Sequence, residues 1–207
     1  MSLLTGFTAG LLLITLSELG DKTFFIGALL AIRYPRRWVF AGVTTALFVM
    51  TVLSVLMGQI VALIPAHYVK WAAVILFISF GVKLLYEAAV MEAGGLEDEQ
   101  AAACAAIQQQ APISKRFGLA QAILLKAFTL TFVAEWGDRT QFATITLAAA
   151  HHPVGVALGA TLGHAICAAI AVVCGKLMAG RLSERWLTGI GGMLFLLFGF
   201  VAVSEAL

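Results

Sequence analysis

Charged side chains are scarce in this chain: Asp, Glu, Lys and Arg make up only 12% of its 207 residues. Soluble domains usually carry about 25% charged residues, so this composition excludes an ordinary soluble protein. Hydrophobic residues account for 61% of the chain, and its mean hydropathy is +0.99. The composition therefore predicts an integral membrane protein.

Cysteine is rare as well, and the net charge is small. The three cysteines, Cys104, Cys167 and Cys174, show no C-x-x-C spacing, so neither a zinc site nor a disulfide framework is indicated. A net charge of +2 indicates no nucleic-acid partner. No basic segment precedes the first apolar run, so no cleavable signal peptide is predicted.

Long apolar runs, in contrast, are abundant. A helix needs about 20 residues to cross a bilayer, and six runs of that length can be read: 5–32, 38–64, 68–89, 118–149, 153–179 and 184–206. Because they cover most of the chain, we expect an all-α protein with six transmembrane helices.

Positive charges are distributed unevenly between the predicted loops. The loops after the first, third and fifth runs share one side of the membrane. With their flanks, these loops contain Arg33, Arg36, Arg37, Lys115, Arg116, Lys176, Arg181 and Arg185, whereas the opposite side has only Lys70. The positive-inside rule then places the three loops in the cytoplasm and both termini on the extracytoplasmic side. We expect a multi-pass protein of the cell inner membrane.

Two of the six runs contain the same charged hexapeptide. ELGDKT occupies Glu18–Thr23, the first motif, and EWGDRT occupies Glu135–Thr140, the second motif, 117 residues later. A charged side chain at the centre of a membrane helix costs roughly 2.5–3.5 kcal/mol even on the lenient insertion scale. Six such residues therefore indicate a site that acts on something charged.

The repetition extends beyond the motifs. A shift of 117 residues also places Gly42 on Gly159, so we predict two copies of one three-helix unit, residues 1–89 and 118–207. An odd number of spans per copy requires the second copy to be inverted in the membrane. Inverted repeats are typical of transporters with a binding site near mid-membrane.

The segment between the two copies, residues 90–117, is predicted to be an acidic cytoplasmic linker. It contains the acidic run Glu97–Glu99 and an Ala/Gln-rich stretch, in which we expect a short helix from Gln100 to Gln110. Short acidic runs usually stay solvated, so we favour a solvated linker over one that gathers cations.

The spacing within each motif favours cation binding. On a helix, residues i and i+3 share one face, so Glu18 would point the same way as Asp21, and Glu135 the same way as Asp138. Brought together, the two pairs give up to four carboxylates. Neutral oxygens lie nearby in the sequence on Thr23, Thr140, Gln141 and Ser17. Such an all-oxygen site suits hard divalent cations.

Other residues allow two interpretations each. Gly20 and Gly137 either unwind the helix, so that backbone carbonyls reach an ion, or allow close helix packing. Lys22 and Arg139 lower the formal charge of each motif from −2 to −1, so a divalent ion would neutralise the pair. The alternative is ion pairs that only fix helix register. His164 is either a nitrogen ligand favouring Mn²⁺ or, as is more common, a packing residue.

Both hexapeptides match an E-x-G-D-[K/R]-[S/T] signature at every defined position. The chain thereby resembles the membrane family that includes bacterial manganese exporters and Golgi manganese/calcium–proton exchangers. The resemblance covers the whole chain and implies export of Mn²⁺, with Ca²⁺ as an open alternative, in exchange for protons. It places cation binding on Glu18, Asp21, Glu135 and Asp138, with Thr23 and Thr140 as auxiliary ligands.

Proton coupling is also expected from the residues, because crowded carboxylates shielded from water resist ionising all at once. Two other functions remain open: an exporter of an amino acid or another small organic cation, and an intramembrane aspartyl protease. The extra glutamates and cations speak against the protease. We therefore expect a transporter and not an enzyme. Its partners are a divalent ion, protons and the lipid bilayer, it has no resident cofactor, and the sequence indicates no oligomeric state.

Overall fold

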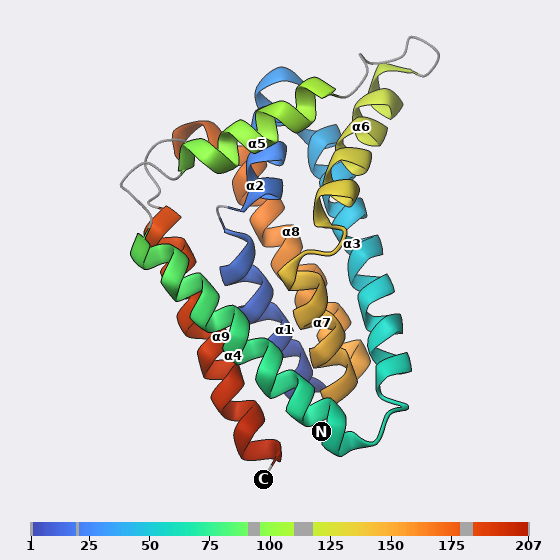
Figure 1. Ribbon diagram of the computed structural model, residues 1–207. Helices are drawn as coiled ribbons and strands as arrows, with labels where there is room; N and C mark the ends of the chain where they lie inside the picture. The colour runs from blue at the N-terminus through green and yellow to red at the C-terminus, as the bar shows by residue number, and fades with distance from the viewer. Residues whose placement is uncertain (1, 20, 91–95, 110–117, 179–183, 207) are drawn as a thin grey trace.

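The computed structural model describes residues 2–19, 21–90, 96–109, 118–178 and 184–206 (Figure 1). The helices in these ranges are α1 (Leu3–Glu18), α2 (Lys22–Arg33), α3 (Arg36–Val61), α4 (Ala66–Val90), α5 (Leu96–Gln109), α6 (Leu119–Glu135), α7 (Arg139–Ala150), α8 (Pro153–Met178) and α9 (Glu184–Ala206). No strand occurs within the same ranges. The prediction of an all-α protein is confirmed.

Three helices are long and apolar enough to cross a membrane on their own: α3, α4 and the Pro153–Val173 part of α8. Two further candidates are bent pairs. The α1–α2 pair is bent by 65° and the α6–α7 pair by 75°, each at a short break. The described residues therefore contain three candidate spans, or up to five if each bent pair counts as one span. Of the six predicted runs, 5–32 and 118–149 each correspond to two helices joined at a break, within the part of the chain that the structure describes.

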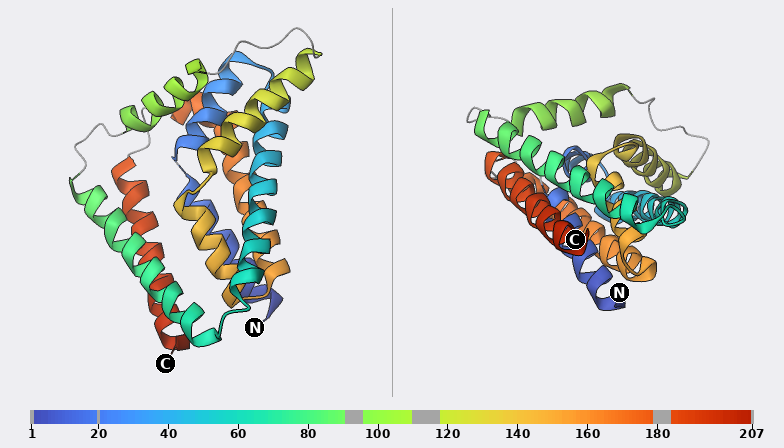
Figure 2. Two further views of the ribbon diagram at one scale, coloured as in Figure 1. Left: turned by 45° about the vertical axis from the view of Figure 1, so that its right-hand side comes forward. Right: turned by 60° about the horizontal axis from the view of Figure 1, so that its bottom comes forward.

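The helices form a bundle with a separate pair on one side. Helices α4 and α9 lie side by side along their length, as both views in Figure 2 show. The remaining long helices pack between the N-terminal and C-terminal parts of the chain: α1 and α2 contact α8, and α6 and α7 contact α3. Both termini lie at one end of the bundle, and α5 lies across the opposite end (Figure 1).

Glycine allows the closest of these helix contacts. A Cβ atom added at Gly159 of α8 would overlap the carbonyl oxygen of Phe7 in α1. A Cβ added at Gly42 of α3 would lie 2.5 Å from the carbonyl oxygen of Leu124 in α6. Small residues at such crossings bring the two backbones together, which is a common way to pack helices in membranes.

Helix α5 is not simply a solvated linker helix. It begins at Leu96, four residues before the predicted start, and it packs against α2. Ala103 and Ile107 on its inner face are buried in the apolar cluster that includes Phe24 and Val39. An amphipathic helix buries such a face whenever an apolar surface is available. The side chains of the acidic run Glu97–Glu99 lie outside the described residues.

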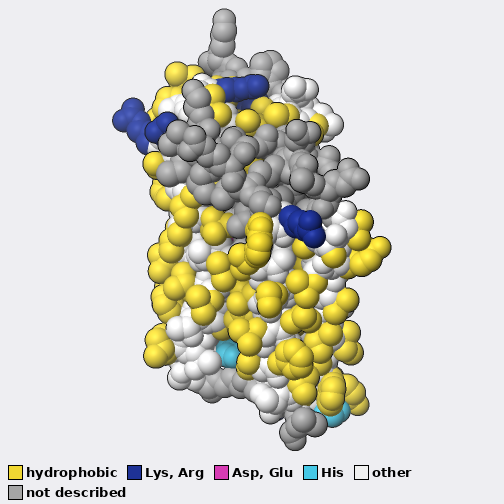
Figure 3. Space-filling view, turned by 90° about the vertical axis from the view of Figure 1, so that its left-hand side faces the viewer, with side chains coloured by type: hydrophobic (Ala, Val, Ile, Leu, Met, Phe, Trp, Pro, Cys, Tyr) yellow, Lys and Arg dark blue, Asp and Glu magenta, His cyan; other side chains and the backbone are white. Residues whose placement is uncertain are grey.

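The outer surface of the bundle is hydrophobic along most of its length. Figure 3 shows hydrophobic side chains over one side of the molecule and Lys and Arg side chains towards the end that carries α5. The exposed apolar residues include Leu56, Ile75 and Phe200, each more than half exposed. An apolar exterior of this kind is expected where lipid surrounds a protein.

Candidate cation site at two helix breaks

Each motif lies across a break between two helices. Helix α1 ends at Glu18 and α2 begins after Asp21, which is its N-cap residue. In the second motif, α6 ends at Glu135 and Asp138 is the N-cap residue of α7. The carboxylates of one motif therefore do not share the face of a continuous helix, as the i, i+3 spacing had suggested. The glutamate ends one helix, and the aspartate starts the next.

Backbone conformation and local hydrogen bonds explain the second break. Gly137 has φ = 84°, a conformation that glycine adopts without steric cost. Its N–H donates to Oε1 of Gln141 at 2.7 Å, and Oδ2 of Asp138 accepts from the backbone N–H of Thr140 at 3.3 Å. Of the two interpretations of this glycine, unwinding is confirmed. Gly20, its counterpart, lies outside the described residues.

Three of the four predicted carboxylates converge. One oxygen each of Glu18, Asp21 and Asp138 lies within 4.8 Å of the other two, and we call this group the carboxylate triad. Glu18 is 2% exposed, and the two aspartates are partly buried. Glu135, 4% exposed, is outside the triad, although Glu18, Asp138 and Asp21 are its electrostatic neighbours.

Hydroxyl groups of both motifs contact the glutamates. Oγ1 of Thr23 donates to Oε2 of Glu18 at 3.3 Å, and Oγ1 of Thr140 donates to Oε2 of Glu135 at 3.4 Å. The second oxygen of Glu18, Oε1, and Oγ of Ser17 are buried without a partner in the described part of the chain. Buried polar atoms normally have a partner, so these free oxygens suit a bound cation.

An ion pair connects the two motifs. Nη2 of Arg139 lies 3.4 Å from Oδ1 of Asp21, with side chains 29% and 12% exposed. If all three triad carboxylates are ionised, they and this guanidinium sum to a formal charge of −2. Lys22, the predicted counterpart of Arg139, is half-buried, and no ion pair with it occurs among the described residues.

A cavity of about 460 Å³ opens beside the second motif. Gly137, Asp138, Arg139 and Phe142 line one wall, and Phe80, Lys83, Leu84 and Glu87 of α4 line the other. Nζ of Lys83 lies 3.7 Å from Oε1 of Glu87 on that second wall. The two side chains are 70% and 38% exposed, so this pair is largely accessible from outside. Its i, i+4 spacing is the signal in the sequence that predicts the pairing.

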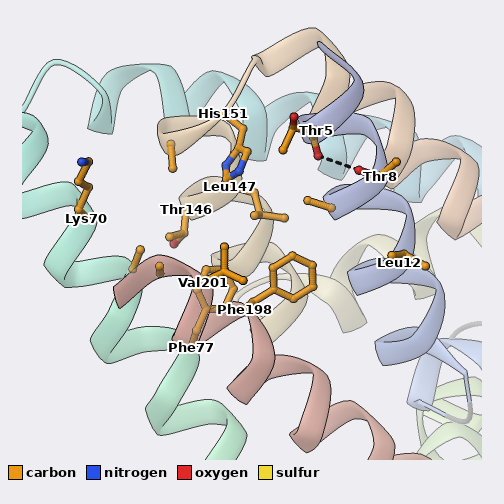
Figure 4. Close-up of a pocket in the computed structure, with 14 residues that line it drawn as sticks. Thr5, Thr8, Leu12, Lys70, Phe77, Thr146, Leu147, His151, Phe198 and Val201 are labelled. Carbon is orange, nitrogen blue, oxygen red and sulfur yellow. Dashed lines mark hydrogen bonds between the residues drawn. The ribbon is translucent and has the colours of Figure 1, made fainter. Parts of the chain in front are cut away.

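Two further cavities lie nearer the end that carries the termini. One, of about 10 Å³, is lined by Leu47, Met50, Thr51, Ser54, Glu135, Thr140, Gln141, Thr144 and His164. The other, of about 220 Å³, lies between α1, α4, α7 and α9 and has a mainly apolar wall that includes Phe77 and Phe198 (Figure 4). None of the residues that line the larger one belongs to a motif.

Buried carboxylates at breaks in the helices of an apolar, multi-pass protein define a membrane transporter for cations. The comparison with known families agrees. A profile described as divalent cation/proton antiporter GDT1 matches residues 6–92 and 123–207, and the chain belongs to this family. Family members are transporters, so the protein is not an enzyme, and the ion is its substrate and not a cofactor.

The chain is similar to curated members of the family over nearly all its length. It is 55% identical to GDT1-like protein sll0615 of Synechocystis over 97% of both chains. It is 43% identical to GDT1-like protein 3 of Oryza sativa subsp. japonica, covering 92% of this chain and 70% of the relative. It is 41% identical to GDT1-like protein 5 of Arabidopsis thaliana, covering 96% and 95%. No solved structure matches the chain.

Proposed function

We propose that the protein exports Mn²⁺ from the cytoplasm in exchange for protons. The ion binds at the carboxylate triad, with Glu135 beside it and Thr23 and Thr140 as auxiliary ligands. The observation that carries this proposal is the convergence of Glu18, Asp21 and Asp138 within 4.8 Å. With Arg139 paired to Asp21, the group has a formal charge of −2, which a divalent ion balances.

We further propose that the chain forms six spans in two inverted halves, residues 1–89 and 118–207. The two glycine contacts described above support this arrangement. Gly159 packs on Phe7, and Gly42 packs on Leu124. A shift of 117 residues converts one pair into the other, so each half holds the first helix of the opposite half in the same way.

The proposed orientation places α5 in the cytoplasm and both termini outside, at the inner membrane of the cell. Exposed arginines at the turn between α2 and α3 and at the start of α9 support it: Arg33, Arg36, Arg37 and Arg185. Lys83 and Glu87 belong to the half of α4 that leads towards α5, so the cavity of about 460 Å³ lies on the cytoplasmic side of the triad. This access favours loading from the cytoplasm.

Proton exchange follows from the charge of the site. Moving a divalent ion outward against an inside-negative potential costs about 4.6 kcal/mol per 100 mV, since each charge costs about 2.3 kcal/mol. Protons that enter as the ion leaves offset this cost. Because carboxylates this close together do not all stay ionised without a cation, the site that releases a metal ion takes up protons.

The size of the triad favours a metal ion over an organic cation, the alternative left open by the sequence. Three oxygens within 4.8 Å of one another suit a single ion bound by direct coordination. An amino acid or a polyamine needs a wider cage with aromatic or apolar walls.

The proposal is tested by Mn²⁺ flux into inside-out proteoliposomes whose lumen is more acidic than the bath. The native protein is compared with Glu18→Gln and Glu135→Gln, and Ca²⁺ is added as competitor. Glu99→Gln on α5 is the matched control, since it makes the same chemical change outside both motifs. We expect flux that requires the proton gradient, disappears in the two motif variants and persists in the control.

Three results would contradict the proposal: no movement of divalent ions by native protein, flux that is indifferent to the proton gradient, or normal flux in either motif variant. The degree of competition by Ca²⁺ measures the preference between the two ions. Far-ultraviolet circular dichroism and elution as a single species in detergent exclude unfolding as the cause of lost flux.

A further inference from the structure

The cavity of about 10 Å³ is small, buried and polar. Its volume is close to that of one water molecule in such measurements, which require roughly 10–15 Å³. Of the nine residues that line it, only Leu47 and Met50 are apolar. A space of this size is just large enough for one small species such as a water molecule or a bare metal ion.

Three of the four hydroxyl groups that line this cavity donate their protons within their own helices. Thr51 donates to the carbonyl oxygen of Leu47 at 2.9 Å, Ser54 to that of Met50 at 2.8 Å, and Thr144 to that of Thr140 at 2.8 Å. Each hydroxyl has one proton and two lone pairs. Because the protons are used within the helices, the oxygens can only accept, which suits a cation and not an anion.

His164 adds a nitrogen to this oxygen-lined space. Its side chain is 5% exposed, and Nδ1 has no hydrogen-bond partner within the described ranges. A buried imidazole normally has a partner for each ring nitrogen. The residue related to His164 by the 117-residue shift is Leu47, which lines the same cavity. The nitrogen is therefore supplied by only one of the two halves.

Glu135 supplies the negative charge. It lines this cavity and is not part of the triad, so the two halves use their glutamates differently. Thr144 lies one turn beyond Thr140 along α7, on the way from the break to the end that carries the termini. In the orientation proposed above, the cavity lies on the extracytoplasmic side of the second motif.

We propose that this cavity is a second cation subsite, next to the triad on the path outward, in which Nδ1 of His164 coordinates the ion. The inference rests on the proposed transport of divalent cations and adds the basis of its selectivity. Imidazole nitrogen binds first-row transition metals, whereas Ca²⁺ takes oxygen ligands. A subsite with one nitrogen ligand therefore selects Mn²⁺ over Ca²⁺. The triad has only oxygen ligands and does not make this selection.

The test is the ratio of Mn²⁺ to Ca²⁺ transport in proteoliposomes. His164→Leu introduces the residue present in the other half, and His164→Gln keeps a polar side chain that offers oxygen. Thr161→Val, about one turn away on α8 and outside the cavity, is the control. We expect both His164 variants to keep Ca²⁺ flux and to lower the Mn²⁺/Ca²⁺ ratio by about tenfold, the lower end of losses seen when a metal environment is altered.

An unchanged ratio in a His164 variant that still transports Ca²⁺ would overturn the subsite. That result differs from failure of the proposed function, in which native protein transports neither ion. If both variants are inactive, electron spin-echo spectroscopy of Mn²⁺ bound to native protein decides. Modulation from a ¹⁴N nucleus supports coordination by the only buried imidazole in the described part of the site, and its absence refutes it.

Discussion

Replacing Arg139 tests whether the chain itself supplies a cation that competes with the transported ion. In the structure, Nη2 of Arg139 lies 3.4 Å from Oδ1 of Asp21, so an ion pair joins the second motif to the first. A metal ion at the triad needs the same carboxylate. If the two compete, Arg139→Gln strengthens Mn²⁺ binding, although it removes an ion pair from the site.

The size of this effect can be worked from the geometry. At 3.4 Å and an effective dielectric constant of about 20, the two charges attract each other by about 5 kcal/mol. Desolvation of both groups offsets most of this attraction, as in other partly buried pairs. We take about 1.4 kcal/mol as the net competition, which corresponds to a tenfold lower KM for Mn²⁺. Release is slowed by the same tighter binding, so maximal turnover falls.

The assay is the initial rate of Mn²⁺ uptake as a function of Mn²⁺ concentration. Arg139→Lys is the matched variant, because it keeps the charge and loses the guanidinium fork. A second comparison adds Asp21→Asn to each background and measures equilibrium binding of Mn²⁺, because a variant that lacks a triad carboxylate is not expected to transport the ion. If Arg139 acts through Asp21, its replacement has little effect on the Kd once Asp21 is neutral. An unchanged or higher KM in Arg139→Gln alone would refute the competition and favour an ion pair that only fixes helix register.

Four further variants test the breaks, the helix contacts and the hydroxyl ligands. Gly137→Ala should destabilise the protein by about 1–2 kcal/mol, because an alanine at φ = 84° adopts a strained left-handed backbone. No neighbouring atom lies within 4 Å of an added Cβ, so no steric clash adds to this cost. Gly159→Ala should lower the melting temperature through its clash with α1. The control is Gly191→Ala in α9, where an added Cβ meets nothing within 4 Å; thermal melts should show no loss of stability in this variant. Thr23→Val and Thr140→Val should each raise the KM for Mn²⁺ by roughly fivefold, equivalent to about 1 kcal/mol, and an unchanged KM in the double variant would exclude both hydroxyls as ligands.

The sequence was sufficient to predict the membrane class, the helical fold and the family. The reason is that hydropathy and a duplicated charged hexapeptide are local signals. The two breaks were not predictable from the same signals. Apolar residues continue on both sides of each motif, so a hydropathy window registers one run where the backbone changes direction by 65° or 75°. The glycine of each motif left unwinding open as one of two interpretations, and the positive φ of Gly137 together with the N-cap position of Asp138 decides for it at the second break.

The different environments of the four carboxylates also could not be predicted without the fold. The two motifs are nearly identical in sequence, and symmetry alone predicts that Glu18 and Glu135 play equal parts. Their environments differ because the neighbouring helices differ: Glu135 lines a small cavity with His164, whereas Glu18 joins the two aspartates. The ion pair between Arg139 and Asp21 likewise joins residues 118 positions apart.

The packing of Phe7 on Gly159 and of Leu124 on Gly42 has a consequence for how such a chain can be divided. In the proposed division into residues 1–89 and 118–207, each half supplies a helix that packs on a glycine of the other half. A separated half would therefore expose both a helix surface and a glycine surface that are covered in the whole chain. The connection through α5 keeps these complementary surfaces at a high local concentration.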